Sequence, residues 1–228
     1  MIRFHFDRSP DMNSVRFADG ESLHVGKMLC LGRNYPEHIR EMEAEIALAP
    51  VVFIKPSTAL VESGEWVVIL PISDDMHHEV ELVVVIGRDG RGIPAEQAME
   101  YVAGYAVGLD MTLRDVQADA KKRGLPWTVA KGFDTSAPLS AAVRAGGVSD
   151  PHALSIQLRV NGTVRQSSNT QHMILRIPGI IAYCSTVFSL EAGDLIFTGT
   201  PEGVGPVIKG DRVTGGIDGL GELSIRIV

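Results

Sequence analysis

The sequence predicts an α+β fold built largely of antiparallel or mixed β-sheet. Eight short runs of β-branched or alternating apolar residues, bounded by Gly, Pro, Asn or Asp, indicate strands. Four longer segments indicate helices, and 24 glycines and 12 prolines are spread along the chain instead of being gathered in a linker. With no repeat or low-complexity segment, all 228 residues are expected to form a single domain.

The expected elements alternate along the chain. The predicted strands lie at 25–32, 50–56, 65–71, 78–87, 101–110, 154–162, 194–200 and 222–228. The predicted helices lie at 34–45, 94–102, 112–124 and 173–188, the last interrupted at Pro178.

Composition narrows the classes of function. Hydrophobic residues make up 45% of the chain, which is ample for a large core, and no apolar run reaches membrane-spanning length. The opening residues lack the apolar stretch of a secretory signal, so a cytoplasmic protein without membrane contact is expected. A net charge of −7 disfavours nucleic acid and favours a small-molecule partner.

The two cysteines are expected to be buried free thiols. Cys30 and Cys184 are far apart in the sequence, and both have apolar neighbours. Neither resembles a nucleophile.

Two glutamates stand at the start of the apolar run HHEVELVVVIG, residues 77–87. Strand side chains repeat every second residue, so Glu79 and Glu81 project from the same face. Carboxylates that close repel each other, and burying them requires protonation or a matching cation. A divalent metal ion is one such cation, and pairing with Lys or Arg is the alternative.

A third acid ends another apolar run, YAVGLD at 105–110. Strand ends often carry ligands, because the sheet fixes the side chain while the adjoining loop admits substrate. Together with the two glutamates, Asp110 would supply three oxygen ligands, a set that suits Mg²⁺ or Mn²⁺. Alternatively, Asp110 caps the helix predicted at 112–124.

The segment GRNYPEHIREM, residues 32–42, contains a possible acid–base pair. Pro36 suits a first helical turn, and His38 and Glu41 are three residues apart on one helical face. A carboxylate beside an imidazole orients it as a general base. The alternatives are a solvated pair on a surface helix, or a polar helix that serves as a lid.

Six motifs in register give the chain a resemblance to a known family. They are GRNYPEHIREM, PVVFIKPSTAL, HHEVELVVVIG, GYAVGLDMTLRDVQ, PWTVAKGFD and FTGTPEGVGP. In this order they resemble the fumarylacetoacetate hydrolase family, and most closely its short single-domain members, the acylpyruvases. The resemblance begins at about residue 24, and residues 1–23 match weakly. It implies a mixed β-sandwich or roll with short flanking helices and a lid helix, usually assembled as a homodimer.

The resemblance also implies roles for individual residues. Glu79, Glu81 and Asp110 would bind Mg²⁺ or Mn²⁺, and His38 with Glu41 would activate water. Lys131 would be catalytic or stabilise an oxyanion. Substrate contacts would come from Arg33, Lys55, Gln117 and Thr200, while Arg114 matches in position but could equally pair with a neighbouring acid.

The implied activity is hydrolysis of acylpyruvates, such as fumarylpyruvate or acetylpyruvate, to pyruvate and a carboxylic acid. The 2-oxo acid end would chelate the metal, and His38 would deprotonate a water that attacks the C4 carbonyl. Lys131 would stabilise the tetrahedral oxyanion, and cleavage of the C3–C4 bond would leave a metal-bound pyruvate enolate.

Other functions suit the same residues. Oxaloacetate decarboxylation yields the same enolate without an activated water. Keto–enol tautomerisation or isomerisation of 2-oxo acids would use the same metal-bound 2-oxo group to stabilise the negative charge. The presence of both His38 and Glu41 favours hydrolysis. A catalytically silent metal-binding protein is the alternative of another class. Direct metal ligation by His77 or His78 is disfavoured, because they face opposite sides of a strand.

Overall fold

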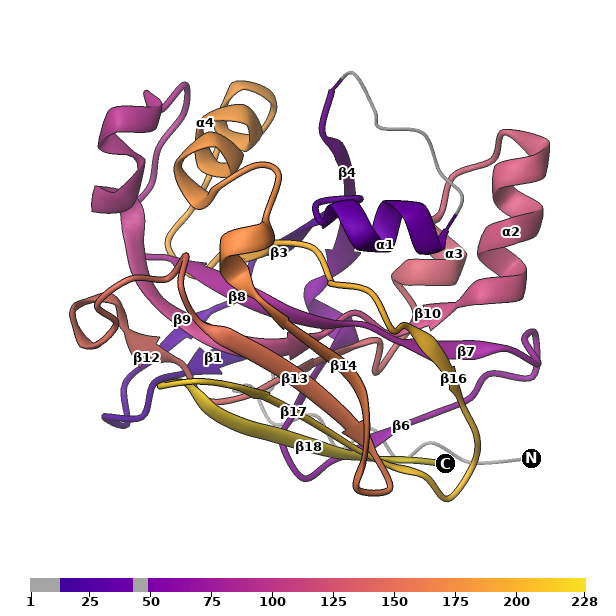
Figure 1. The fold of residues 1–228 in the computed structure, drawn as a ribbon. Coiled ribbons are helices and arrows are strands. Elements are labelled where there is room, and N and C mark those ends of the chain that lie inside the picture. The colour runs from indigo at the N-terminus through magenta and orange to yellow at the C-terminus, as the bar shows by residue number, and fades with distance from the viewer. Residues whose placement is uncertain (1–12, 43–48) are drawn as a thin grey trace.

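The computed structural model describes residues 13–42 and 49–228. Two mixed β-sheets of eight and five strands form most of the structure. Figure 1 shows the five-stranded sheet at the bottom of the view and the four α-helices at the top, with β8 and β9 of the larger sheet between them. The predicted α+β class and mixed sheets are therefore confirmed.

The larger sheet carries the two strands that predicted the acidic cluster. Its order is β4-β3-β15-β8-β9-β11-β5, with β12 also pairing with β9. The pairs β3–β15 and β5–β11 are parallel and the others are antiparallel. The bounds are β3 Lys27–Gly32, β4 Val51–Pro56, β5 Leu60–Glu62, β8 Val80–Ile86, β9 Val102–Leu109, β11 Ala137–Leu139, β12 Val143–Arg144 and β15 Leu195–Phe197.

The smaller sheet has the order β14-β13-β17-β18-β6. Its strands are β6 Trp66–Val67, β13 Ser155–Val160, β14 Thr163–Asn169, β17 Arg212–Ile217 and β18 Gly221–Ile227. Asn161 and Gly162 join β13 to β14 with φ values of 51° and 81°. Two consecutive positive φ angles are typical of the tight hairpin turn that Asn-Gly favours.

The remaining elements connect and cover these sheets. Two small sheets consist of β1 Ser14–Arg16 with β2 Ser22–His24, and of β7 Met76–His78 between β10 Thr112–Leu113 and β16 Gly205–Val207. The α-helices are α1 Pro36–Glu41, α2 Arg114–Arg123, α3 Thr128–Lys131 and α4 Ile177–Val187. The 3-10 helices are η1 Ser57–Ala59, η2 Ala95–Tyr101, η3 Ala145–Gly147 and η4 Thr170–His172. None of the helices in the described part of the chain has the length and apolar character needed to cross a membrane.

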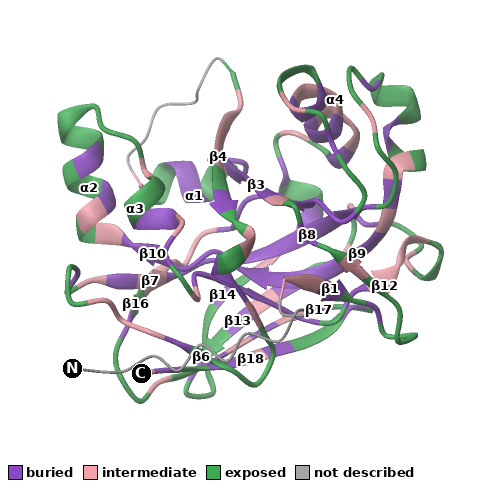
Figure 2. Ribbon diagram, turned by 180° about the vertical axis from the view of Figure 1, so that it is seen from behind, coloured by how far each residue is buried: buried purple, intermediate pink, exposed green. Residues whose placement is uncertain are grey.

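Strand β8 is buried along its whole length, as the view from behind in Figure 2 also shows. Its side chains alternate between two apolar clusters. Val80, Leu82 and Val84 belong to the cluster that includes the inner residues of the smaller sheet, whereas Val83 and Val85 belong to the other. By the same alternation, Glu79 and Glu81 point to the side of the strand on which Val83 and Val85 lie.

Most predicted elements are present, with three corrections. The helix expected at 173–188 begins only at Ile177, so Pro178 lies in its first turn and does not interrupt it. The segment 94–102 forms the 3-10 helix η2 instead of an α-helix. Of the strand expected at 65–71, only Trp66 and Val67 pair, because their partner β18 ends at Ile227. The helix expected at 34–45 is described as far as Met42, and its residues 43–45 lie outside the described part.

Candidate metal centre and active site

The register of β8 and β9 brings the three predicted acids together. Glu81 pairs with Gly108, and one step further the Asp110 amide donates to the Glu79 carbonyl at 2.9 Å. One carboxylate oxygen from each of Glu79, Glu81 and Asp110 lies within 4.8 Å of the others. The residues are 5%, 1% and 1% exposed. Asp110 does not cap the following helix, since α2 begins at Arg114 with Leu113 at its N-cap.

Three basic residues, Lys131, Arg114 and Lys55, surround this triad. The Lys131 ammonium lies 2.6 Å from Asp110 and 3.0 Å from Glu79, and it is itself buried. Arg114 pairs with Glu79 and also donates to the Gln117 side chain at 2.7 Å. The site therefore balances most of its buried negative charge with fixed positive charge.

Lys55 lies behind the triad and not on the pocket wall. Its ammonium is 2.8 Å from Asp110 and donates to the carbonyls of Met111, Lys131 and Ser136. The side chain is 0% exposed. This geometry does not support the predicted substrate contact, because all of the donors face protein oxygens, and it gives Lys55 the role of holding Asp110 in place.

Glu79 and Glu81 are in opposite electrostatic situations. Burial alone would raise the pKa of Glu79, but Lys131 and Arg114 hold it well below its usual value. Burial raises the pKa of Glu81 well above its usual value, and the neighbouring charges of Asp110 and Glu79 raise it further. The Gly199 amide donates to Glu81 at 2.7 Å, and within the described residues no basic side chain pairs with it. Glu81 is thus a buried carboxyl that lacks a cation.

The donor set fits a hard divalent ion. Three carboxylates on one sheet face offer the oxygen ligands that Mg²⁺ and Mn²⁺ prefer, with room for substrate oxygens in the remaining positions. A divalent ion would also supply the positive charge that Glu81 lacks. Neither His77 nor His78 joins this group, as Nε2 of His77 lies 3.0 Å from Asp75 and Nδ1 of His78 lies 3.2 Å from Gln166.

The predicted dyad forms on α1. His38 Nδ1 lies 3.3 Å from Glu41 Oε2, and the imidazole is buried. The Gly203 amide donates to both carboxylate oxygens of Glu41, at 3.0 and 3.2 Å. The same glycine lies in the Gly- and Pro-rich loop TGTPEGVGP, residues 198–206, whose backbone amide thus binds a carboxylate. The helix is less exposed than its charges suggested, because His38 and Ile39 turn inward while Glu37 and Arg40 remain at the surface.

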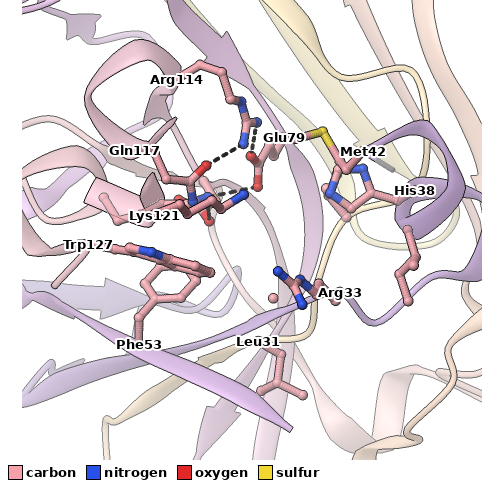
Figure 3. A pocket seen from close by; sticks show the side chains of 15 residues that line it. Leu31, Arg33, His38, Met42, Phe53, Glu79, Arg114, Gln117, Lys121 and Trp127 are labelled. Carbon is pink, nitrogen blue, oxygen red and sulfur yellow. Dashed lines mark hydrogen bonds and ion pairs between the residues drawn. The ribbon is translucent and has the colours of Figure 1, made fainter. Parts of the chain in front are cut away.

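One pocket connects these groups. It is lined by Leu31, Gly32, Arg33, His38, Ile39, Met42, Phe53, Glu79, Asp110, Arg114, Gln117, Lys121, Trp127, Lys131 and Thr200. Figure 3 shows His38 and Glu79 on one side of it, with Phe53 and Trp127 on the other. Of the predicted substrate contacts, Arg33, Gln117 and Thr200 line the pocket.

Sequence reasoning missed a buried glutamine that ties the site to the smaller sheet. Gln166 of β14 donates to Thr200 Oγ1 at 2.8 Å and to the Pro201 carbonyl at 2.9 Å, and accepts from the Val80 amide at 3.0 Å. It also missed Phe53, Lys121 and Trp127. Lys121 occupies the last turn of a predicted helix, where a surface lysine is ordinary, and β14 is too polar to have signalled a strand.

Comparison with known proteins supports the family resemblance. A sequence model described as Fumarylacetoacetate (FAA) hydrolase C-terminal matches residues 27–228. The chain belongs to the fumarylacetoacetate hydrolase family. Members of this family are enzymes, with hydrolase, decarboxylase, tautomerase or isomerase activity.

Among curated relatives, the mouse protein named oxaloacetate tautomerase FAHD1, mitochondrial, is 50% identical over 200 residues, covering 88% of this chain and 90% of that protein. Its counterpart from Arabidopsis thaliana is 47% identical over 201 residues, with the same coverage of both chains.

Solved structures agree with the fold. The fumarylpyruvate hydrolase of Pseudomonas aeruginosa, in complex with Mn²⁺ and pyruvate, superposes with a TM-score of 0.92 at 42% identity, covering 98% of this chain and 99% of that one. The 5-carboxymethyl-2-hydroxymuconate delta-isomerase of Mycobacterium smegmatis gives a TM-score of 0.80 at 36% identity, covering 92% and 85%.

Proposed function

We propose that this protein is a divalent-metal-dependent acylpyruvate hydrolase, which converts a 2,4-dioxo acid and water into pyruvate and a carboxylic acid. The observation that carries the proposal is a single pocket lined by Glu79 and Asp110 of the carboxylate triad and by His38, whose imidazole contacts Glu41. The likeness to a fumarylpyruvate hydrolase that holds Mn²⁺ and pyruvate supports it.

Glu79, Glu81 and Asp110 would hold the metal, which would supply Lewis-acid polarisation of the 2-oxo acid end of the substrate. Whether the ion is Mg²⁺ or Mn²⁺ is a separate question for metal analysis. Arg114 donates a hydrogen bond to the Gln117 side chain at 2.7 Å and pairs with Glu79. The two side chains would orient a substrate carboxylate that docks at the triad.

His38 is the general base. Glu41 accepts from the imidazole and fixes its tautomer, which leaves the other ring nitrogen to take a proton from water. The resulting hydroxide adds to the C4 carbonyl, and the Lys131 ammonium stabilises the oxyanion that develops there. The C3–C4 bond then breaks, its electron pair passes into pyruvate enolate, and a proton added at C3 completes the pyruvate.

A second function is favoured by the curated relatives, which are named oxaloacetate tautomerases. Removing a proton from C3 of oxaloacetate and returning it to oxygen would use the same base and the same anchor for the 2-oxo acid. Decarboxylation of oxaloacetate would need only the anchor and the electron sink. The cytoplasmic location stays a prediction, since these relatives carry mitochondrial names.

The three activities separate in one experiment. Initial rates would be measured with Mn²⁺ or Mg²⁺ on acetylpyruvate, on fumarylpyruvate, and on oxaloacetate for both enol–keto exchange and loss of carbon dioxide. The variant His38→Ala should lose hydrolysis and tautomerisation, since both need a base, and keep decarboxylation. Equal loss of every activity in that variant would contradict the division of roles. A wild-type protein that turns over none of these acids with metal supplied would instead support a catalytically silent metal-binding protein.

A further inference from the structure

One wall of the pocket is aromatic. The rings of Phe53 and Trp127 lie 6.0 Å apart with an interplanar angle of 58°, on β4 and just before α3. Each ring has a lysine ammonium over it: Lys131 is 5.0 Å from the centre of the Phe53 ring, and Lys121 is 5.3 Å from that of Trp127. The wall thus has Lys131, which contacts the triad, over one ring and Lys121, in the last turn of α2, over the other; Figure 3 shows Phe53, Trp127 and Lys121 on the same side of the pocket.

The two ends of this wall differ in charge balance. At the inner end, Lys131 has carboxylate partners in Glu79 and Asp110. At the outer end, Lys121 has a ring beneath it, and no carboxylate of the described residues forms an ion pair with it. The ring holds the ammonium in position without neutralising it, since a cation–π contact removes no charge.

Further positive charge converges on the outer end. Arg33 lines the pocket, and Figure 3 shows its guanidinium turned into the space between Trp127 and His38. Its φ of 63° is uncommon for a residue other than glycine, and such conformations cluster at functional sites. Burial lowers the pKa of Lys121, and the charges of Arg114, Arg33 and Lys131 lower it further, which places these three cations within electrostatic reach of Lys121.

We propose that Lys121 and Arg33 form a second anion subsite, which selects 2-oxo acids that carry a carboxylate at the end remote from the metal. This inference rests on the proposed function, because it assumes that the 2-oxo acid end docks at Glu79, Glu81 and Asp110. The flat wall of Phe53 and Trp127 between the two ends suits a planar, conjugated chain. Fumarylpyruvate meets both requirements, whereas acetylpyruvate ends in a methyl group.

The proposed subsite places acyl-group selectivity at Lys121 and not in the segment that follows α1. A lid that selects the acyl group would be expected in the segment EMEAEIALAP, residues 41–50, of which residues 43–48 lie outside the described part of the chain. Lys121 lies instead on the opposite rim, in the last turn of α2. Charge at this rim gives selectivity by attraction to the anionic substrate and leaves a neutral acyl group without a partner.

Substitution of Lys121 tests the proposal through substrate preference. Lys121→Met keeps the length and apolar stem of the side chain and removes its charge. We expect kcat/KM for fumarylpyruvate to fall roughly tenfold, mainly through KM, because a charge-assisted contact with the substrate is lost. The value for acetylpyruvate should fall clearly less, so that the ratio of the two values changes, and Lys121→Arg should restore most of the preference.

The matched control is Lys122→Met. Lys122 is the next residue of the same helix, is exposed and does not line the pocket, so the preference should not change. If Lys121→Met lowers kcat/KM for both substrates equally, or changes neither, the subsite does not exist.

A binding measurement separates this inference from the proposed function. Calorimetric titration of the Mn²⁺-loaded protein would compare 2-oxoglutarate with 2-oxopentanoate, and 2-oxoadipate with 2-oxohexanoate, pairs in which a carboxylate replaces a terminal methyl. Tighter binding of the diacid in at least one pair, lost in Lys121→Met, would support the subsite even if no substrate is turned over. No preference in either pair would overturn the inference, while hydrolysis of acetylpyruvate would leave the proposed function intact.

Discussion

The floor of the pocket and its rim are built in different ways. On the floor, Glu81 lies in β8, Glu79 directly precedes β8 and Asp110 directly follows β9, and the register of these antiparallel strands is fixed by a ladder of backbone hydrogen bonds. On the rim, His38 and Glu41 belong to a six-residue helix that has no side-chain N-cap and depends on a contact with Gly203. Strand pairing can therefore define a ligand geometry tightly, whereas a short helix would leave the proposed base, His38, freer to adjust when a substrate enters. The predictions below test that difference.

The largest effect is expected on the floor, at Asp110. Asp110→Asn removes a proposed metal ligand and the carboxylate that faces both Lys55 and Lys131. Metal affinity should fall by at least about 100-fold. The free energy of unfolding, measured by urea in the presence of a chelator, should fall by about 3 kcal/mol, because two buried ammonium groups lose a negative charge and keep only Glu79 and backbone carbonyls as partners.

Glu81→Gln is the matched control for that substitution. Burial and two neighbouring acids raise the pKa of Glu81, and no basic side chain of the described residues pairs with it, so a neutral amide there should cost the chelated protein little. This variant should lose metal binding and keep its stability within about 0.5 kcal/mol. Equal loss of stability in both variants would show that Asp110 and Glu81 contribute equally to the stability of the metal-free protein, which would contradict this explanation.

On the rim, Glu41→Gln should reduce hydrolysis by about 100-fold, because the neutral amide no longer stabilises the imidazolium. Metal affinity should be unaffected, since Glu41 is not part of the triad. Glu37→Gln is the control, as Glu37 is exposed on the same helix and pairs with Arg40. A fall in metal affinity in Glu41→Gln would mean that floor and rim are not independent.

A smaller effect is expected at Gly203. Its φ is 89°, and a Cβ there would lie 2.1 Å from the Arg165 carbonyl oxygen. Gly203→Ala should shift the amide that holds Glu41 and lower kcat by roughly tenfold, with a destabilisation of about 1–3 kcal/mol. A crystal structure of the variant with the Glu41 contact intact, together with reduced kcat, would contradict this explanation.

The last prediction concerns pH and His78, which lies next to Glu79 of the floor. Burial lowers the pKa of His78 to about 4, below its ordinary value of 6.5. Because the unfolded chain binds this proton more readily, the neutral form stabilises the fold above pH 6.5, and that contribution is lost as the pH falls towards 4. Between these values the loss should approach about 1.4 kcal/mol per pH unit. Urea unfolding of the chelated protein and of His78→Gln at pH 7 and 5 measures it, and parallel losses in both proteins would exclude His78 as the source.

Much of the site was predictable because its spacing is local. The alternation of strand side chains placed Glu79 and Glu81 on one face, and the helical spacing of His38 and Glu41 placed them in contact. The confirmed α+β class follows from the same periodicities. The homodimer implied by the family stays a prediction, which analytical ultracentrifugation would test.

What escaped prediction depends on contacts between distant parts of the chain. Lys55 looks like an ordinary strand lysine, and only the folded structure shows its ammonium among three carbonyls and Asp110. The strands β14 and β17 are polar or glycine-rich, so they lack the apolar pattern that signals a strand. Gln166 consequently gave no sign of its link to Thr200.

The alternation of β8 restricts how the gene for this chain can vary in length. Loss or gain of one residue between Val80 and Val85 would turn Glu79 and Glu81 toward the apolar core that contains Leu158 and Ile225. Valine side chains would then face the pocket in their place. Natural insertions and deletions should therefore accumulate in connecting loops and be absent from this strand. In a library of single-codon deletions scored for folding, no folded variants should be recovered with a deletion at those positions.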